Sequence, residues 1–220
     1  MAILVTGGAG YIGSHTCVEL LQAGEDIVLL DNFSNAKPQV VNRIKELSGR
    51  DFPLYAVDIL HREGLEKIFA REDIEAVIHF AGLKAVGESV KIPLDYYQNN
   101  VSGTINLCQV MARAGCKKIV FSSSATVYGN STDVPFREDS PLSTTNPYGS
   151  TKRMVEDILR DLCASDPEWS ACLLRYFNPI GAHKSGLLGE DPNGIPNNLL
   201  PYIAKVAVGQ LERLNVFGND

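Results

Sequence analysis

The chain has 220 residues, 45% of them hydrophobic, which is enough to bury a sizeable core and excludes global disorder. The formal net charge of −6 argues against a general binder of nucleic acids or anionic membranes, because phosphate surfaces attract basic faces. No apolar run is long enough to cross a bilayer, and the N-terminal Met-Ala-Ile-Leu-Val-Thr lacks the positive segment of a signal peptide.

The cysteines and histidines give no sign of a metal site. The five cysteines are scattered, odd in number and without Cys-x-x-Cys spacing, and the four histidines also lack ligand spacing. We therefore expect reduced thiols, a cytoplasmic location and no bound metal.

Apolar runs typical of β-strands alternate along the chain with segments of helical periodicity. The expected strands are Ile3–Thr6, Ile27–Leu30, Leu54–Val57, Ala76–Phe80, Lys118–Ser122 and Ala171–Leu174. The expected helices are Tyr11–Ala23, Val40–Leu47, Arg62–Arg71, Tyr96–Ala114 and Tyr148–Cys163. This alternation predicts an α/β fold of the doubly wound type, with a parallel sheet covered by helices on both faces.

The character of the sequence changes after Arg175. Residues 178–196 are rich in Gly, Pro and Asn with little periodicity, which is typical of functional loops in enzymes. A helix is expected at Pro201–Gln210 and a short strand at Asn215–Phe217. Because a domain rarely stops directly after a strand, we expect the sequence to be a fragment.

Three glycines follow the first strand and open the first helix. Gly7, Gly10 and Gly13 have the spacing G-x-x-G-x-x-G, a variant of the dinucleotide fingerprint. The first two permit a tight turn and close approach to a pyrophosphate, and Gly13 permits close packing of the helix on the strand. Since the helix N-terminus also favours an anion, the motif predicts a Rossmann-type dinucleotide site.

Two carboxylates end the second and third expected strands. Asp31 lies where it can accept hydrogen bonds from both ribose hydroxyls, and it would repel a 2′-phosphate, so the sequence favours NAD over NADP. Asp58 lies where a side chain can meet the adenine edge. Either carboxylate could instead be only a turn residue.

Tyr148 and Lys152 are four residues apart on an expected helix and therefore share one face. A free tyrosine, with a pKa of about 10, is too weakly acidic to act as a base at neutral pH, but a nearby ammonium and a nicotinamide cation favour the phenolate. Ser124 follows the fifth strand, at the sheet edge where ligands bind, and could orient a substrate alcohol or relay its proton. Together these three residues predict proton-transfer catalysis beside a dinucleotide.

Longer segments resemble the extended short-chain dehydrogenase/reductase family and, within it, the UDP-glucose 4-epimerases. They are Gly7–His15, His79–Ser89, Ser122–Gly129, Leu174–His183 and Gly189–Asn198. The similarity covers the whole chain, and these strings are much more specific than the glycine motif or Tyr-x-x-x-Lys.

The resemblance implies contact residues for a cofactor and a substrate. The implied NAD contacts are Gly7, Gly10, Tyr11, Ile12, Gly13, Asp31, Asn32, Phe33, Ser34, Asn35, Ala36, Asp58, Ile59, Phe80, Ala81, Gly82, Lys84, Asn99, Ser122, Tyr148, Lys152 and Phe177. The implied UDP-sugar contacts are Lys84, Ser124, Tyr148, Tyr176, Phe177, Asn178, Asn198, Leu199, Asn215, Val216 and Phe217. From the pattern alone, Tyr176 and Phe177 could be core aromatics, and Asn198 could cap the following helix.

The resemblance also implies a reaction. Tyr148 would take the proton of the sugar 4-hydroxyl with help from Ser124, and the 4-keto sugar would rotate between two hydride transfers. This is reversible C4 epimerisation of UDP-galactose and UDP-glucose with tightly bound NAD, as in galactose metabolism. Residues 1–175 would form the NAD-binding domain, and residues 176–220 the start of a UDP-sugar-binding region. The family is commonly dimeric, so a homodimer is expected, and the long helices Tyr96–Ala114 and Tyr148–Cys163 could pair with the second subunit.

Three alternative functions stay open. An epimerase for UDP-N-acetylhexosamines or UDP-pentoses would share all these motifs. A nucleotide-sugar 4,6-dehydratase needs an Asp-Glu pair after the serine, where this sequence has Ala125 and Thr126. A non-catalytic NAD-binding regulator would have no need of Ser124, Tyr148 and Lys152.

Overall fold

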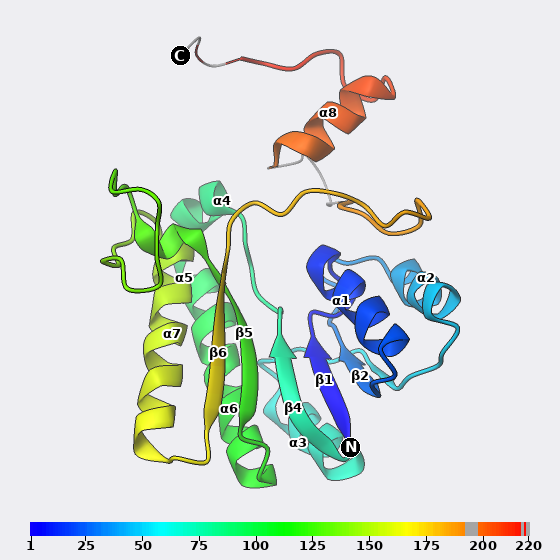
Figure 1. Ribbon diagram of the computed structural model, residues 1–220, viewed down its shortest axis with the longest axis vertical. Coiled ribbons are helices and arrows are strands. Elements are labelled where there is room, and N and C mark those ends of the chain that lie inside the picture. The colour runs from blue at the N-terminus through cyan, green and yellow to red at the C-terminus, as the bar shows by residue number, and fades with distance from the viewer. Residues whose placement is uncertain (192–197, 217, 219–220) are drawn as a thin grey trace.

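A parallel sheet organises the protein, whose computed structural model describes residues 1–191, 198–216 and 218. Its strands are β1 (Ala2–Thr6), β2 (Ile27–Leu30), β3 (Leu54–Tyr55), β4 (Ile74–His79), β5 (Lys118–Ser124) and β6 (Ser170–Tyr176). They are ordered β3-β2-β1-β4-β5-β6, and all neighbours are parallel (Figure 1). The predicted doubly wound fold is confirmed. Since the strand order reverses at β1 and β4, a ligand crevice is expected at their carboxyl ends.

Five longer helices cover the two faces of the sheet (Figure 1). They are α1 (Tyr11–Gln22), α2 (Gln39–Ser48), α3 (Arg62–Arg71), α6 (Gly103–Ala114) and α7 (Pro147–Ser165). Alternate side chains of each strand point to opposite faces, so β1 feeds two separate cores. Val5 packs in a cluster with side chains of α1 and α2, whereas Leu4 packs in a cluster with side chains of α3, α6 and α7.

The region predicted as one helix from Tyr96 to Ala114 is interrupted. Helix α5 (Pro93–Tyr96) runs into a π-helical turn, η1 (Tyr97–Ser102), before α6 begins, and a short helix α4 (Val86–Lys91) precedes them. Inside η1 the Asn100 side chain bonds both backbone groups of Leu83, at 2.8 and 2.9 Å. Apolar spacing does not distinguish a π turn from an α turn, so the sequence could not reveal this break.

Strand lengths also differ from the prediction. The edge strand β3 pairs only at Leu54 and Tyr55, whereas β5 and β6 continue together in register to the pair Ser124 and Tyr176. The short 3-10 helix η2 (Ala125–Tyr128) follows β5 directly. The extension matters because it carries the serine run and the following aromatic residues to the same edge of the sheet.

The segment after β6 crosses above the carboxyl edge of the sheet and leads to α8 (Leu199–Ala207) (Figure 1). This helix begins and ends earlier than the predicted Pro201–Gln210. The predicted strand at Asn215–Phe217 is wrong for Asn215 and Val216, which are exposed and unpaired in any sheet, while Phe217 lies outside the described residues. Within the described part of the chain, no helix is long and apolar enough to cross a membrane.

Candidate cofactor and active site

A cleft of about 1460 Å³ opens at the carboxyl edge of the sheet. The predicted site residues that line it are Gly7, Gly10, Tyr11, Ile12, Gly13, Asp31, Asn32, Ser34, Asn35, Ala36, Ile59, Phe80, Ala81, Gly82, Lys84, Asn99, Ser122, Ser124, Tyr148, Lys152, Tyr176, Phe177, Asn178 and Asn198. Phe33, Asp58, Leu199, Asn215 and Val216 do not line it. Residues far apart in the sequence therefore converge on one cavity, large enough for an extended ligand.

The glycine loop between β1 and α1 leaves room only for glycine at two positions. Gly7 has φ +67°, and a Cβ on it would lie 2.6 Å from the Ala81 nitrogen. A Cβ on Gly13 would lie 2.3 Å from the Gly7 carbonyl oxygen. Gly10, the N-cap residue of α1, lines the cleft and has no side chain that could cap the helix. The positive end of α1 is therefore open to the cleft.

Asp31 is almost fully buried beside this loop. Its carboxylate accepts hydrogen bonds from the Ala9 nitrogen at 3.0 Å and the Phe33 nitrogen at 2.8 Å. Burial raises the pKa of Asp31, and these two backbone hydrogen bonds act in the opposite direction. The carboxylate thus fastens the turn that follows β2 to the glycine loop.

Asp58 has the contacts of a turn residue. Its carboxylate accepts hydrogen bonds from the Leu60 nitrogen at 2.8 Å and from the Asn32 amide at 2.7 Å. These contacts join the turns after β2 and β3. A role for Asp58 at an adenine edge stays a prediction.

Helix α7 brings Tyr148 and Lys152 to the end of β5. The helix is capped by Asn146, whose side-chain oxygen accepts from the Gly149 nitrogen at 2.9 Å, and Pro147 occupies its first turn. The Lys152 ammonium donates to the Ser122 carbonyl at 2.7 Å and lies 5.8 Å from the centre of the Tyr148 ring. The predicted pairing of tyrosine and lysine on one face is therefore present.

Burial controls the protonation of both groups. It lowers the pKa of Lys152 to about 8 and raises the pKa of Tyr148, while a hydrogen bond with Ser124 acts to lower the latter. Ser124 is nearly buried, and its hydroxyl oxygen accepts from the Thr126 nitrogen at 3.2 Å. The three predicted catalytic residues thus lie together at one end of the cleft.

Two buried polar residues near this site had no role in the sequence analysis. The Asn100 amide, besides its bonds to Leu83, donates to the Thr151 hydroxyl at 3.0 Å, which ties the loop after β4 to α7. His79 is held between the hydroxyls of Thr6 and Thr104, and burial lowers its pKa to about 3. The only sign of this network in the sequence is the adjacent pair Asn99 and Asn100, within an uncharged stretch of the predicted helix.

The predicted substrate residues are divided between the cleft and the solvent. Lys84 pairs with Glu190 at 3.4 Å, and the Asn198 amide donates to the same carboxylate at 2.7 Å instead of capping α8. Phe177 is 62% exposed, so it is not a core aromatic, and it stacks at 6.4 Å on Phe136. Leu199, Asn215 and Val216 are exposed outside the cleft, and Phe217 lies outside the described residues.

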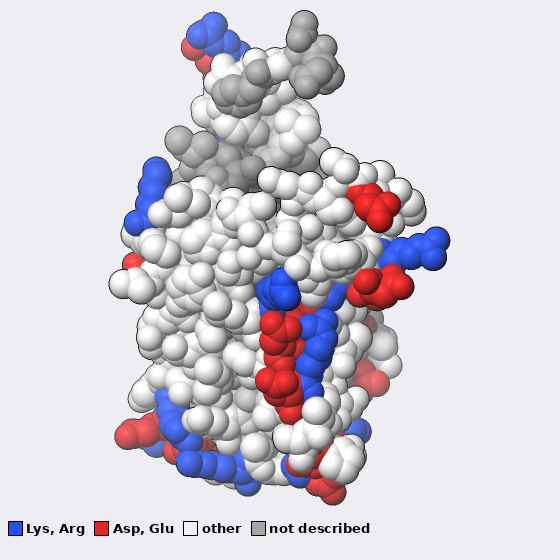
Figure 2. All heavy atoms as spheres, turned by 90° about the vertical axis from the view of Figure 1, so that its left-hand side faces the viewer, with Lys and Arg blue, Asp and Glu red and all other residues white. Residues whose placement is uncertain are grey.

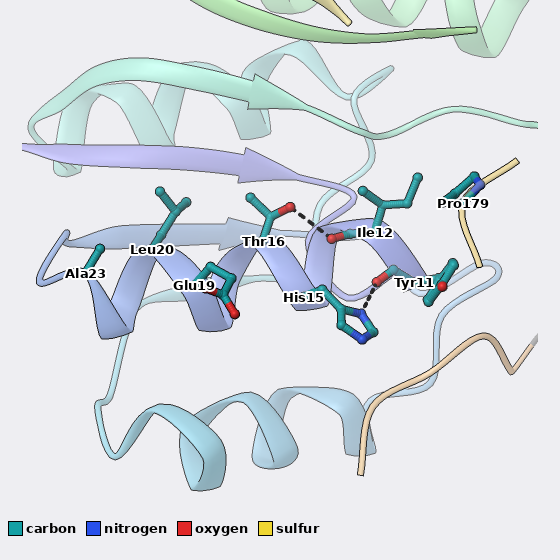
Figure 3. Close-up of a pocket in the computed structure, with 8 residues that line it drawn as sticks. All are labelled: Tyr11, Ile12, His15, Thr16, Glu19, Leu20, Ala23 and Pro179. Atoms are coloured by element: carbon teal, nitrogen blue, oxygen red, sulfur yellow. Dashed lines mark hydrogen bonds between the residues drawn. The ribbon is translucent and has the colours of Figure 1, made fainter. Parts of the chain in front are cut away.

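A smaller pocket of about 550 Å³ lies on the outer side of α1 (Figure 3). Two of its polar side chains turn back to the helix: His15 contacts the Tyr11 carbonyl at 2.8 Å, and Thr16 donates to the Ile12 carbonyl at 3.0 Å. Of the predicted site residues, only Tyr11 and Ile12 line it.

Among the residues that the structure describes, no cluster of His, Cys, Asp and Glu could hold a metal ion. The large cleft is therefore the candidate functional site.

Comparisons with known proteins point to one family. Residues 3–220 match the model of the NAD dependent epimerase/dehydratase family. A UDP-glucose 4-epimerase of Bacillus subtilis is 66% identical over 220 residues, which are 100% of this chain and 65% of that protein. The chain thus spans about 65% of that relative's length.

Two crystal structures share the fold closely. The UDP-glucose 4-epimerase of Bifidobacterium longum, in complex with NAD+ and UDP, has a TM-score of 0.94 and 52% identity, covering 96% of this chain and 64% of that one. The UDP-glucose 4-epimerase of Stenotrophomonas maltophila, with bound NAD and formylated UDP-arabinopyranose, has a TM-score of 0.96 and 50% identity, covering 99% of this chain and 65% of that one.

Proposed function

Since the chain belongs to the NAD dependent epimerase/dehydratase family, we propose that it binds NAD and catalyses the reversible C4 epimerisation of UDP-galactose and UDP-glucose. The observation that carries the proposal is the meeting of Tyr148, Lys152 and Ser124 at one end of a cleft that starts at the glycine loop. The bacterial relatives named above as UDP-glucose 4-epimerases support this choice of reaction.

The cleft fits NAD at the glycine loop. A side chain on Gly7 or Gly13 would collide with neighbouring backbone, so the loop keeps its N–H groups close to any pyrophosphate above the N-terminus of α1. Asp31 would accept the ribose hydroxyls, and Lys152 would reach the nicotinamide ribose. When bound, NAD would accept the C4 hydride of the sugar and return it, so no NADH would accumulate.

The proposed proton transfer uses three residues of this chain. Tyr148 takes the proton of the sugar 4-hydroxyl, and Ser124 orients that hydroxyl. Lys152 stabilises the phenolate that this step requires, because an opposite charge nearby favours the ionised form. After the sugar has turned, the same phenol returns the proton, so Tyr148 regains its starting state at the end of each cycle.

The residues after Ser124 favour an epimerase over a 4,6-dehydratase. Ala125 has no ionisable group, and the Thr126 hydroxyl donates to Ser124 at 3.0 Å, so this position holds no acid/base pair for eliminating water. Lys84 lies at the cleft and would meet a phosphate of the UDP-sugar once Glu190 released it. Residues 1–175 would form the NAD-binding domain, and residues 176–220 the beginning of the UDP-sugar region.

We also propose that two copies of the protein pair in the cytoplasm. Residues 96–112 contain no charged residue, and Leu94 and Met154 expose 79% and 44% of their surface. Figure 2 shows that much of the corresponding side of the molecule carries no charged side chain. All five cysteines are free, as a reducing compartment would keep them. Native mass spectrometry would count the subunits and any bound nucleotide together.

Incubation of the purified protein with UDP-galactose tests the proposed reaction. UDP-glucose should form, without net NADH and without a 4-keto-6-deoxy sugar. Formation of the deoxy product would favour a dehydratase, and conversion of only N-acetylated or pentose substrates would favour a related epimerase. NAD binding without turnover of any UDP-sugar would leave a regulatory NAD-binding protein as the better description.

A further inference from the structure

One stripe of α7 contacts three consecutive serines of β5. Tyr148 lies close enough to Ser124 for that hydroxyl to act on the pKa of the phenol, and Lys152 donates to the Ser122 carbonyl. One turn further on, Glu156 accepts a hydrogen bond of 2.5 Å from the Ser123 hydroxyl. Residues four apart share a helix face, which is why the three side chains reach neighbouring residues of one strand. The proposed reaction uses the first two contacts but not the third.

Glu156 is a fully buried carboxylate with unusually complete hydrogen bonding. Besides Ser123, it accepts from Arg175 at 3.0 and 2.8 Å and from Arg160 at 2.8 Å. Burial raises the pKa of Glu156, but the hydrogen bonds from Arg175, Ser123 and Arg160 outweigh it and hold the pKa below its usual value. The group is therefore an ion that is fixed in place from several directions.

Arg175 extends this network to both sides of the serine run. It lies on β6 directly opposite Ser123, and its guanidinium also donates to the Tyr128 hydroxyl at 3.0 Å and the Glu138 carbonyl at 3.1 Å. Tyr128 ends η2, the 3-10 helix that begins just after Ser124. Ser124 therefore lies between two groups that the ion pair holds in place: Ser123, whose hydroxyl donates to Glu156, and η2, whose last residue Tyr128 accepts from Arg175.

We propose that Glu156, held by Arg175, is a positioning residue that fixes Ser123 and so sets the alignment of Ser124 with Tyr148. The inference rests on the function proposed above. A buried ion pair can often be replaced by apolar side chains without loss of stability, so stability alone gives no reason for a charged pair here. The alignment of the catalytic residues does give a reason for the charged pair, because misplacing a catalytic group by about 1 Å can lower turnover by about 10²-fold.

Three variants of the NAD-bound protein test the proposal. Ser123→Ala removes only the hydroxyl that joins β5 to Glu156, and Glu156→Gln keeps the shape but removes the charge. Arg160→Ala is the matched control, since Arg160 contacts the same carboxylate from a half-exposed position and reaches neither β5 nor β6. Should Glu156→Gln fail to fold, the conservative Ser123→Ala still decides the question.

We expect Ser123→Ala and Glu156→Gln to lower kcat by about 10- to 100-fold, with KM for UDP-galactose and the amount of bound NAD nearly unchanged. The rising limb of the kcat profile should also move to higher pH, because the Ser124 hydrogen bond that lowers the pKa of Tyr148 is weakened. Lys152 and Tyr96, the titratable groups facing Tyr148, are unaltered in these variants. Arg160→Ala should keep the kcat and pH profile of the parent protein.

A fall in melting temperature with unchanged kcat and pH profile would overturn the proposal and leave Glu156 a structural residue. If the parent protein itself turns over no UDP-sugar, the proposed function fails separately. The positioning claim is then tested by the ultraviolet absorbance of the Tyr148 phenolate, measured as the difference from Tyr148→Phe in each background. A shift of that titration to higher pH in Ser123→Ala supports the claim, and an unchanged titration overturns it.

Discussion

Lys152 is predicted to destabilise the protein when no ligand is bound, so Lys152→Met should make the ligand-free protein more stable while abolishing turnover. The ammonium is only 5% exposed, and burial lowers its pKa from 10.5 to about 8. A difference of this size corresponds to about 3 kcal/mol of destabilisation of the charged folded form. Methionine has a similar length and no charge to desolvate.

The variant loses two favourable contacts of the ammonium: the hydrogen bond to the Ser122 carbonyl and the contact with the Phe121 ring, whose centre lies 4.8 Å away. Together they are worth about 1–2 kcal/mol, which leaves a net gain of about 1–2 kcal/mol at pH 7. The sign depends on pH: the unfolded chain binds more protons than the folded chain between about pH 8 and 10.5, so parent stability rises across that window. The advantage of Lys152→Met should therefore be complete below pH 8 and fade towards pH 10.5.

Urea denaturation of nucleotide-free protein, measured at several pH values, checks this prediction. The exposed Lys67→Met is the control and should give no comparable gain. The claim that desolvation of the Lys152 ammonium destabilises the protein would be refuted by either of two results: a Lys152→Met variant no more stable than the parent at pH 7, or a gain in its free energy of unfolding that did not shrink as the pH rose.

The glycine loop, Asp31 and Tyr148 each give a further prediction. Gly13→Ala should cost about 1–3 kcal/mol and weaken NAD binding, because its Cβ would lie 2.3 Å from the Gly7 carbonyl, whereas Gly87→Ala, with open space around it, should be neutral or stabilising by urea denaturation. NAD should bind more than tenfold tighter than NADP, a difference in binding free energy above about 1.4 kcal/mol. Asp31→Ser should reduce this preference for NAD. Equal affinities of the parent protein for NAD and NADP, measured by calorimetry, would contradict the role proposed for Asp31. Tyr148→Phe should retain NAD and the melting temperature but lose about 10²- to 10⁴-fold in kcat, and a near-normal rate would require another base.

The parts of the fold that the sequence alone predicted are those that depend on local spacing. Alternating strand and helix periodicity was enough to predict a parallel α/β sheet, because each element buries a face with its own repeat. The three glycines before α1 and the four-residue interval from Tyr148 to Lys152 are also local patterns. They predicted a cofactor loop and a shared helix face without knowledge of any distant contact.

Tertiary structure decided what those residues face and how they are charged. Glu156 of α7 and Arg175 of β6 are 19 residues apart and meet because α7 packs against β6, and Lys84 meets Glu190 across 106 residues. In the π turn, the Asn100 side chain contacts Leu83 in a loop and Thr151 in α7. No helical repeat in the sequence predicts these contacts. The pKa of Lys152 likewise depends on burial by several elements at once. Sequence periodicity specifies which side of an element is apolar, but the partner of a buried polar group, and hence its charge, is set by how separate elements pack together.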